Sequence, residues 1–105
     1  MISYDIEYSP EAIRDLDDVF ADVLTASSDM ELTHNYLDEL QDKIVAMAGH
    51  PETGTPLYYE DLFTGYYFVR YKEYLVFYRL DNGKMLVDRV LFRKRDYLRV
   101  LFHFE

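Results

Sequence analysis

Six of the nine Lys and Arg side chains in residues 50–105 are candidates for stabilising negative charge on phosphate. Three are adjacent, in the run Arg93-Lys94-Arg95, and the others are Arg70, Arg79 and Arg89. RNA cleavage by attack of a 2′-OH on the adjacent phosphate needs such cations, a base for the hydroxyl and an acid for the leaving oxygen. Tyr97 or His103 could donate the proton, and Glu73 could accept it. The candidate catalytic residues are therefore Arg93, Lys94, Arg95 and Tyr97.

The same cations also have structural interpretations. Arg89 follows Asp88 and could simply pair with a carboxylate, and Arg95 could form a local pair with Asp96. The functional and structural interpretations weigh equally for Arg95. A structural role is favoured for two further arginines, Arg70 and Arg79.

Other kinds of chemistry lack their residue types in this sequence. There is no Cys, so disulfides, thiolate metal sites and a thiol nucleophile are excluded. The three histidines, His34, His50 and His103, are scattered without the spacing of metal ligands, and we expect them to be inert surface residues. No phosphate-binding glycine loop or nucleophile motif is present. We therefore expect no metal and no cofactor.

The candidate residues lie on or beside a stretch, residues 65–102, that predicts three successive strands. Val, Leu, Phe and Tyr fill runs near Tyr66–Tyr71, Tyr74–Leu80 and Met85–Phe92. Asn82-Gly83 between the last two runs predicts a two-residue hairpin turn with positive φ at both positions. The middle run is apolar for most of its length, so we expect a central strand covered on both faces. Strand alternation would place Arg89 and Arg93 on one face.

The first half of the chain predicts a strand and a helix that help to cover this sheet. Residues 1–8 alternate, with Ile2, Tyr4 and Ile6 on one side of a half-buried strand. Ser9 as N-cap and Pro10 at the first helical position begin a helix that extends to about residue 26. Its apolar stripe comprises Ala12, Ile13, Leu16, Val19, Phe20, Val23 and Leu24, and its solvated outer face carries Asp15, Asp18 and Asp22.

A second helix is predicted over residues 30–48, after a cap at Asp29. Gly49 is expected to end this helix in the left-handed conformation, and Pro51 prevents its continuation. We expect an irregular loop over residues 49–64 and a short apolar tail over residues 97–105. The apolar stripe of the second helix is Thr33, Leu37, Leu40, Ile44 and Met47.

Composition and charge limit the classes of function. The 105 residues, half of them apolar, suffice for one core, so residues 1–105 are expected to form a single domain. No apolar run reaches the length of a membrane span and no signal peptide is evident, which predicts a cytoplasmic protein. Residues 1–49 carry twelve acidic and two basic residues (net −10), and residues 50–105 carry eight and nine (net +1). The total of −9 disfavours general nucleic-acid binding.

The expected order β-α-α-β-β-β resembles the RelE/ParE superfamily, the toxins of bacterial type II toxin–antitoxin modules, in its RelE/StbE or ParE-like, plasmid-stabilisation branches. The resemblance covers nearly the whole chain and rests on an ordered set of segments rather than on one motif. It implies an α+β fold in which a helical hairpin packs on a mostly antiparallel sheet. The segments are Tyr8-Ser9-Pro10-Glu11-Ala12, the Pro- and Gly-containing residues 49–56, Tyr74-Leu75-Val76-Phe77-Tyr78-Arg79, and residues 89–98 with their basic run.

Several positions depart from the pattern of these relatives. This chain has Tyr67 where relatives usually carry Arg, Phe92 where His or Tyr is frequent, Arg93 where Gly is common, and Leu75 where RelE-type nucleases place Arg. Because these differences leave the set of nuclease residues incomplete, the resemblance favours a ParE-like toxin that acts by protein binding, with DNA gyrase as the target in that branch. The alternatives are a RelE-like, ribosome-dependent mRNA endonuclease and a degenerate, inactive toxin. Whether the chain is an enzyme is therefore left open.

The resemblance also implies one partner under every hypothesis, a small cognate antitoxin. A disordered antitoxin segment typically folds across the helices and sheet of such a toxin. Antitoxins are generally acidic where they touch a basic toxin, and the acidic helices of this chain would repel such a segment. We therefore expect the contact at Arg93-Lys94-Arg95 or in an apolar groove. A homodimer is possible.

Overall fold

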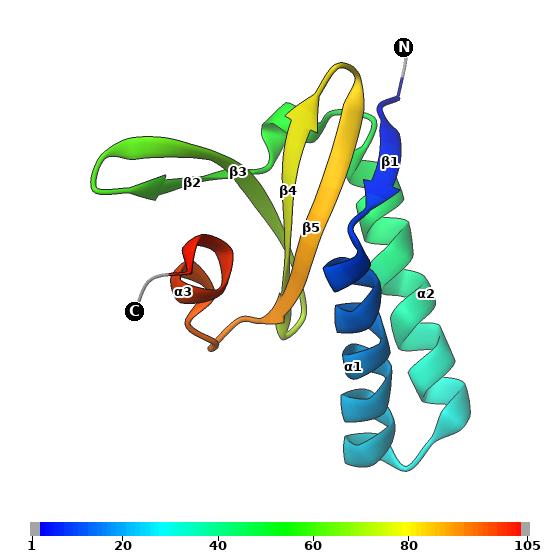
Figure 1. Ribbon diagram of the computed structural model, residues 1–105. Coiled ribbons are helices and arrows are strands. Elements are labelled where there is room, and N and C mark those ends of the chain that lie inside the picture. The colour runs from blue at the N-terminus through cyan, green and yellow to red at the C-terminus, as the bar shows by residue number, and fades with distance from the viewer. Residues whose placement is uncertain (1–2, 104–105) are drawn as a thin grey trace.

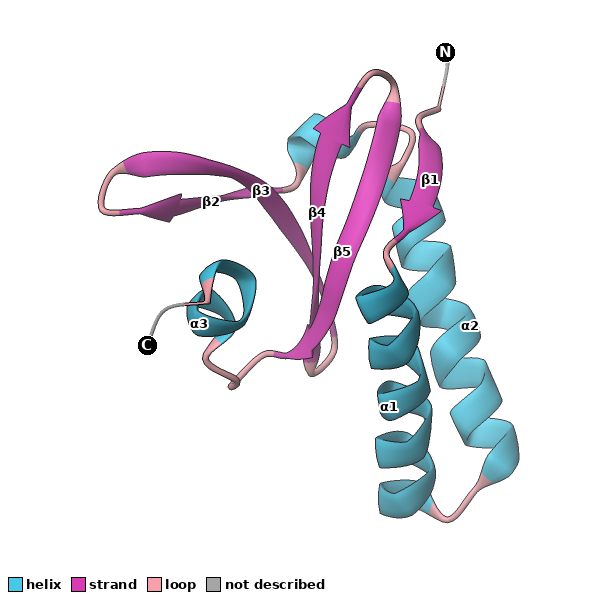
Figure 2. Cartoon of the chain, viewed as in Figure 1, coloured by secondary structure: helices cyan, strands magenta, loops and turns pink. Residues whose placement is uncertain are grey.

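The structure, a computed structural model, describes residues 3–103 and contains a five-stranded sheet between two layers of helix (Figures 1 and 2). The strand order is β1-β5-β4-β3-β2, with β1 parallel to β5 and the other neighbours antiparallel. The expected α+β fold with a mostly antiparallel sheet is confirmed. Its elements are β1 (Asp5–Tyr8), α1 (Pro10–Ser27), α2 (Met30–Met47), a 3₁₀ turn (Pro51–Thr53), β2 (Thr55–Tyr59), β3 (Leu62–Tyr71), β4 (Tyr74–Asp81), β5 (Lys84–Phe92) and α3 (Tyr97–Phe102).

Side-chain caps begin both long helices as the sequence predicts. The hydroxyl of Ser9 accepts a hydrogen bond from the Ala12 N–H at 2.9 Å, and the Asp29 carboxylate accepts one from the Leu32 N–H at 3.0 Å. The left-handed residue lies after α1, at Ser28 with φ 54°. The prediction for Gly49 is wrong, because α2 ends in a right-handed turn in which the Gly49 N–H donates to the Ala46 carbonyl.

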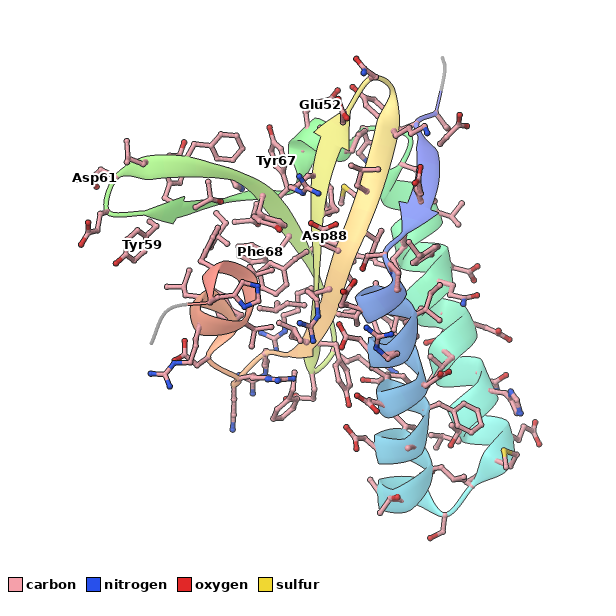
Figure 3. The ribbon with its side chains drawn as sticks, in the orientation of Figure 1. Glu52, Tyr59, Asp61, Tyr67, Phe68 and Asp88 are labelled. Carbon is pink, nitrogen blue, oxygen red and sulfur yellow. The ribbon has the colours of Figure 1, made fainter. Side chains whose placement is uncertain are left out.

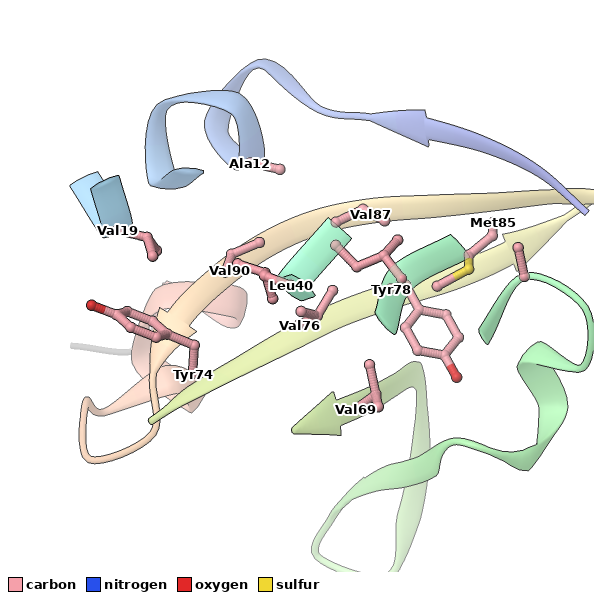
Figure 4. Close-up of a cluster of buried hydrophobic side chains, with 12 residues drawn as sticks. Ala12, Val19, Leu40, Val69, Tyr74, Val76, Tyr78, Met85, Val87 and Val90 are labelled. Carbon is pink, nitrogen blue, oxygen red and sulfur yellow. The ribbon is translucent and has the colours of Figure 1, made fainter. Parts of the chain in front are cut away.

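The predicted β3-β4-β5 meander is confirmed, including its turn. Asn82 and Gly83 have φ of 49° and 78°, as a type I′ turn requires. Strand β4 is buried on both faces from Tyr74 to Tyr78. Its helix-facing side packs with Ala12 and Val19 of α1 and Leu40 and Ile44 of α2 (Figure 4).

The prediction of an irregular loop over residues 49–64 is wrong, because most of this segment forms the 3₁₀ turn, β2 and the first residues of β3. The β2–β3 hairpin turns at Glu60 and Asp61, which both have positive φ (49° and 69°) without a glycine. The sequence lacks the usual marker of such a turn there, so the hairpin was missed. Figure 3 shows Tyr59 and Asp61 at the end of this hairpin, which projects from the rest of the sheet.

The apolar tail expected after residue 96 is helical over its described part. Asp96 caps α3 by accepting a hydrogen bond from the Arg99 N–H at 3.4 Å. The helix covers the second face of the sheet, where it packs on a cluster formed by Leu57, Leu75, Phe77 and Leu91. This explains why β4 needs apolar residues on both faces.

The helical stripes are confirmed for α2 and only in part for α1. Thr33, Leu40 and Ile44 are buried on α2. On α1, Ile13 is 53% exposed, whereas Asp15, predicted on the outer face, is only 6% exposed. The first helix is therefore rotated so that a carboxylate faces the sheet. Across residues 3–103, no helix is long and apolar enough to cross a membrane.

Gly54 provides a test of the packing beside the 3₁₀ turn. A Cβ at this position would overlap the hydroxyl of buried Tyr78, which donates a hydrogen bond to the Pro51 carbonyl at 2.6 Å. We expect Gly54→Ala to lower the free energy of unfolding by about 1–3 kcal/mol, because the Tyr78 ring would have to shift. Gly49→Ala is the control, since the nearest atom to its Cβ would lie at 3.6 Å. Equal losses in urea denaturation would contradict this.

Candidate functional site

A bidentate ion pair between Asp15 and Arg89 connects α1 to β5, so that Arg89 is not free to bind a phosphate. The Arg89 guanidinium donates to Asp15 from Nε to Oδ2 at 2.7 Å and from Nη2 to Oδ1 at 2.9 Å. The Val90 N–H donates to the same Oδ2 at 2.9 Å. These contacts raise the pKa of Arg89, chiefly through the hydrogen bond to Asp15. The structural interpretation of Arg89 is confirmed.

A β-bulge makes this geometry possible. Phe77 pairs with Arg89, and the next residue of β4, Tyr78, pairs with Val87, so Asp88 is the extra residue of β5. A bulge leaves one residue outside the ladder and re-aims the neighbouring side chains. Arg89 reaches α1, whereas Asp88 contacts Arg79 and Tyr66; Figure 3 marks Asp88 on β5. The bulge thus directs the adjacent residues Asp88 and Arg89 to different partners, Arg79 and Asp15.

Asp88 is the centre of the second contact. Its Oδ2 accepts hydrogen bonds from the Tyr66 hydroxyl at 2.9 Å and from Arg79 Nε at 2.8 Å. Arg79 also lies 5.7 Å from the centre of the Tyr66 ring. Burial and then the hydrogen bond to Asp88 raise the pKa of Tyr66 to about 12, so its hydroxyl stays protonated at neutral pH. The structural role favoured for Arg79 agrees with this contact.

The predicted base and one predicted cation bind each other. Arg93 Nε donates to Glu73 Oε2 at 2.8 Å, and the Arg93 N–H donates to the Glu73 carbonyl at 2.8 Å. Arg70 Nε donates to the Lys72 carbonyl within the same β3–β4 turn at 2.7 Å. Strand β5 ends at Phe92, so the alternation expected to place Arg93 beside Arg89 stops one residue short. The shared-face prediction is wrong, and each arginine contacts a different carboxylate.

Two of the four candidate catalytic residues have free cationic groups. Lys94 and Arg95 are exposed, and neither side chain forms an ion pair within the described chain. The Tyr97 ring packs on Phe77 with centroids 5.2 Å apart, as part of the core beneath α3. His103 is exposed and ends α3 in the left-handed conformation. A catalytic role for Arg93, Lys94, Arg95 and Tyr97 stays a prediction.

The positions that depart from the family pattern have structural surroundings. Tyr67 stacks on Tyr78 with centroids 5.7 Å apart and an interplanar angle of 15°. Leu75, only 8% exposed, belongs to the core beneath α3. Phe92 is 42% exposed and packs edge-on against Tyr74. Apolar contacts therefore occupy positions where the resemblance places cations or a polar ring. Among residues 3–103, no cluster of three potential metal ligands occurs.

A groove that the sequence analysis did not locate lies between the helical hairpin and the end of the sheet. Val23 and Ala26 of α1, Leu32 and Tyr36 of α2, and Phe92 contribute to its lining. Its central part has a volume of about 530 Å³. The helical stripe placed Val23 on the buried side but gave no sign that the hairpin extends past the sheet, which Figure 1 shows.

Replacing Asp15 tests the contact between α1 and β5. Asp15→Ala leaves the Arg89 guanidinium and the Val90 N–H without their acceptor, so we expect a loss of about 3–5 kcal/mol in the free energy of unfolding. The exposed Asp17 on the same helix is the control, with a change within about 0.5 kcal/mol for Asp17→Ala. Similar urea midpoints for the two variants would contradict a stabilising role for this pair.

Comparison with solved structures finds chains with the same fold. A chain described as the chromosomal ParDE toxin–antitoxin system from P. aeruginosa matches with a TM-score of 0.72 and 11% identity, over 86% of this chain and 96% of that chain. A chain of the toxin–antitoxin complex RelBE2 from Mycobacterium tuberculosis matches with a TM-score of 0.61 and 22% identity, over 90% of this chain and 97% of that chain. YafQ from E. coli strain BL21(DE3) matches with a TM-score of 0.50 and 17% identity, over 94% of this chain and 98% of that chain.

The sequence itself also matches a family profile. A search of curated proteins finds no significant match. The profile described as "ParE toxin of type II toxin-antitoxin system, parDE" matches residues 6–97, which extend from β1 to the first residue of α3. The matched region therefore includes the helical hairpin, the sheet and the basic run. The chain belongs to the ParE toxin family of type II toxin–antitoxin systems.

Proposed function

We propose that this toxin acts by protein contact, with DNA gyrase as its target, and that a cognate antitoxin neutralises it. The observation that carries the proposal is the engagement of its cations in the fold. Arg79, Arg89 and Arg93 each contact a carboxylate at 2.7–2.8 Å. Cleavage of RNA needs cations that are free to approach the scissile phosphate, and these three are not.

Overall electrostatics point the same way. The net charge of −9 repels the phosphate backbone of ribosomal RNA at long range. Lys94 and Arg95 form a local basic surface at the turn between β5 and α3. A surface with two cations suits recognition of an acidic patch on a protein better than docking along RNA, which presents many phosphates. For the second candidate function, a RelE-like mRNA endonuclease, the four candidate catalytic residues supply only these two cations without an ion pair inside residues 3–103.

The proposal also includes an antitoxin partner, a cellular location and the extent of the toxin domain. The P. aeruginosa and M. tuberculosis structures with this fold are described as a toxin–antitoxin system and a toxin–antitoxin complex. By analogy, we assign this chain an antitoxin partner, a cytoplasmic location and one toxin domain over residues 1–105. A degenerate toxin would keep the antitoxin partner and lack the target.

Two assays on the purified toxin distinguish the candidate functions. We expect inhibition of gyrase supercoiling, which preincubation with the antitoxin relieves. With purified ribosomes and mRNA, we expect no codon-positioned cuts by primer extension, because the acid–base set is incomplete. Such cuts would instead support the RelE-like endonuclease. Inactivity in both assays would support a degenerate toxin.

The free cations provide a test of the active surface. We expect Lys94→Ala with Arg95→Ala to raise the toxin concentration for half-maximal gyrase inhibition at least tenfold, because the target loses its basic contact. Arg14→Ala with Lys43→Ala is the matched control, since it removes two charges from exposed positions on the helical hairpin. Equal effects of the two double variants would show that only net charge matters.

A further inference from the structure

Three adjoining hollows form one continuous groove at the end of the helical hairpin where α1 turns into α2. Leu32 and Tyr36 line both the first and the second hollow. Asp22, Tyr74 and Phe92 line both the second and the third. We call this continuous surface the hairpin groove. Its lining residues come from α1 and α2 near their connection, from the β3–β4 turn, from the start of β4 and from the end of β5.

The floor of the hairpin groove is apolar and partly open to solvent. Leu32 is 46% exposed and Phe92 is 42% exposed. Leu32 is open because the hairpin extends beyond the sheet that covers its other turns, and Phe92 is the last residue of β5. Apolar residues gathered in a concave surface are typical of sites that receive the apolar face of a partner helix.

The rim of the hairpin groove is strongly acidic. Its lining residues include seven acids and two bases, Lys72 and Arg95, and with the arginines that pair with two of these acids, Arg89 and Arg93, the net charge is −3. Three of the acids are paired, Asp15 with Arg89, Glu39 with Lys72 and Glu73 with Arg93. Within residues 3–103, the other four form no ion pair; they are Asp18, Asp22, Asp29 and Glu31.

This charge acts on the floor of the groove. Tyr74 donates a hydrogen bond of 3.4 Å to Asp22, and its ring forms part of the lining. Burial, followed by the negative charge of Asp22, raises the pKa of Tyr74 to about 12. Asp22 and Asp18, two of the unpaired carboxylates, are therefore close enough to influence a group inside the groove. A cation placed there would be stabilised by the same field.

We propose that the hairpin groove binds a helical segment of the antitoxin that carries apolar residues on one face and Lys or Arg along its flanks. The assignment rests on the proposed toxin–antitoxin function and states the chemistry of the partner segment. Apolar side chains would cover Leu32, Phe92 and Tyr36, and the flanking cations would meet the unpaired carboxylates. An acidic segment, expected from the general pattern of antitoxins, would meet repulsion on both rims.

Other occupants fit the hairpin groove less well. Nucleic acid would bring phosphates to a rim that carries net negative charge. A second copy placed symmetrically on this surface would bring two acidic rims together, which disfavours a dimer through this face. A cationic amphipathic helix satisfies the floor and the rim at once.

Charge reversal on one rim tests the proposal. The toxin and the antitoxin encoded beside it are purified, and the dissociation constant is measured by titration at several salt concentrations. We expect Asp18→Lys with Asp22→Lys to weaken the complex at least tenfold. Asp38→Lys with Asp42→Lys makes the same change in net charge at exposed positions of α2 outside the groove, and should change the affinity less than threefold. Melting curves show whether each variant is folded.

Two further measurements do not depend on charge-reversed variants. Raising the salt concentration should weaken the wild-type complex, because attraction between opposite charges is screened; an acidic segment would bind more tightly as salt rises. Phe92→Ser should weaken the complex at least fivefold, whereas Val45→Ser, at an exposed apolar residue outside the groove, should not.

The outcomes separate the inference from the proposed function. A complex that tolerates the Asp18 and Asp22 reversals, or that strengthens with salt, would overturn the cationic segment and leave the antitoxin partner standing. Absence of any complex with the wild-type toxin would overturn the antitoxin partner and this assignment together. Loss of affinity confined to the groove variants, with screening by salt, supports the proposal.

Discussion

The contact between Asp15 of α1 and Arg89 of β5 is the constraint on which the rest of this structure depends. It joins residues 74 positions apart and places a carboxylate, 6% exposed, beside the guanidinium and a strand N–H. A charge removed from water needs a partner and further hydrogen bonds, and Asp15 has three donors. This requirement fixes the rotation of α1 against the sheet, and the bulge in β5 is what lets Arg89 reach the helix. It also turns Ile13 to the surface.

The bulge has a consequence for function because it assigns the charges of β5 to the scaffold. Arg89 serves the helical layer, and Asp88 holds Arg79 and Tyr66 near the opposite face. With Arg93 on Glu73, the cations that suggested phosphate chemistry are mostly structural. Of those six cations, Arg70, Lys94 and Arg95 form no ion pair within residues 3–103, and Arg95 also lines one end of the acidic hairpin groove. Two surfaces therefore remain for partners, the basic one at Lys94 and Arg95 and the acidic hairpin groove beside it. Both surfaces suit recognition of proteins, and they differ in the charge of the partner they select.

Local patterns in the sequence predicted most of the fold. The two long helices follow from their stripes and from caps at Ser9 and Asp29, and the last hairpin follows from Asn82-Gly83. Strand β2 was missed because its turn uses Glu60 and Asp61 at positive φ, which no local rule marks. Helix α3 was missed because six residues are too few for a periodic signal. The family and the toxin class were also recognisable from the order of the segments. The candidate catalytic residues stay predictions.

The sequence by itself determined the elements whose signals lie within a few residues, namely the caps, the stripes, the Asn-Gly turn and the division of charge between the two halves. Only the tertiary structure decided which carboxylate each arginine contacts, because the paired residues are 9, 20 and 74 positions apart for Asp88, Glu73 and Asp15. It also decided that α1 and α2 extend past the sheet and leave Leu32 and Phe92 open beside unpaired carboxylates. Ion pairing and groove formation depend on distances across the fold, and residue spacing along the chain does not encode them locally.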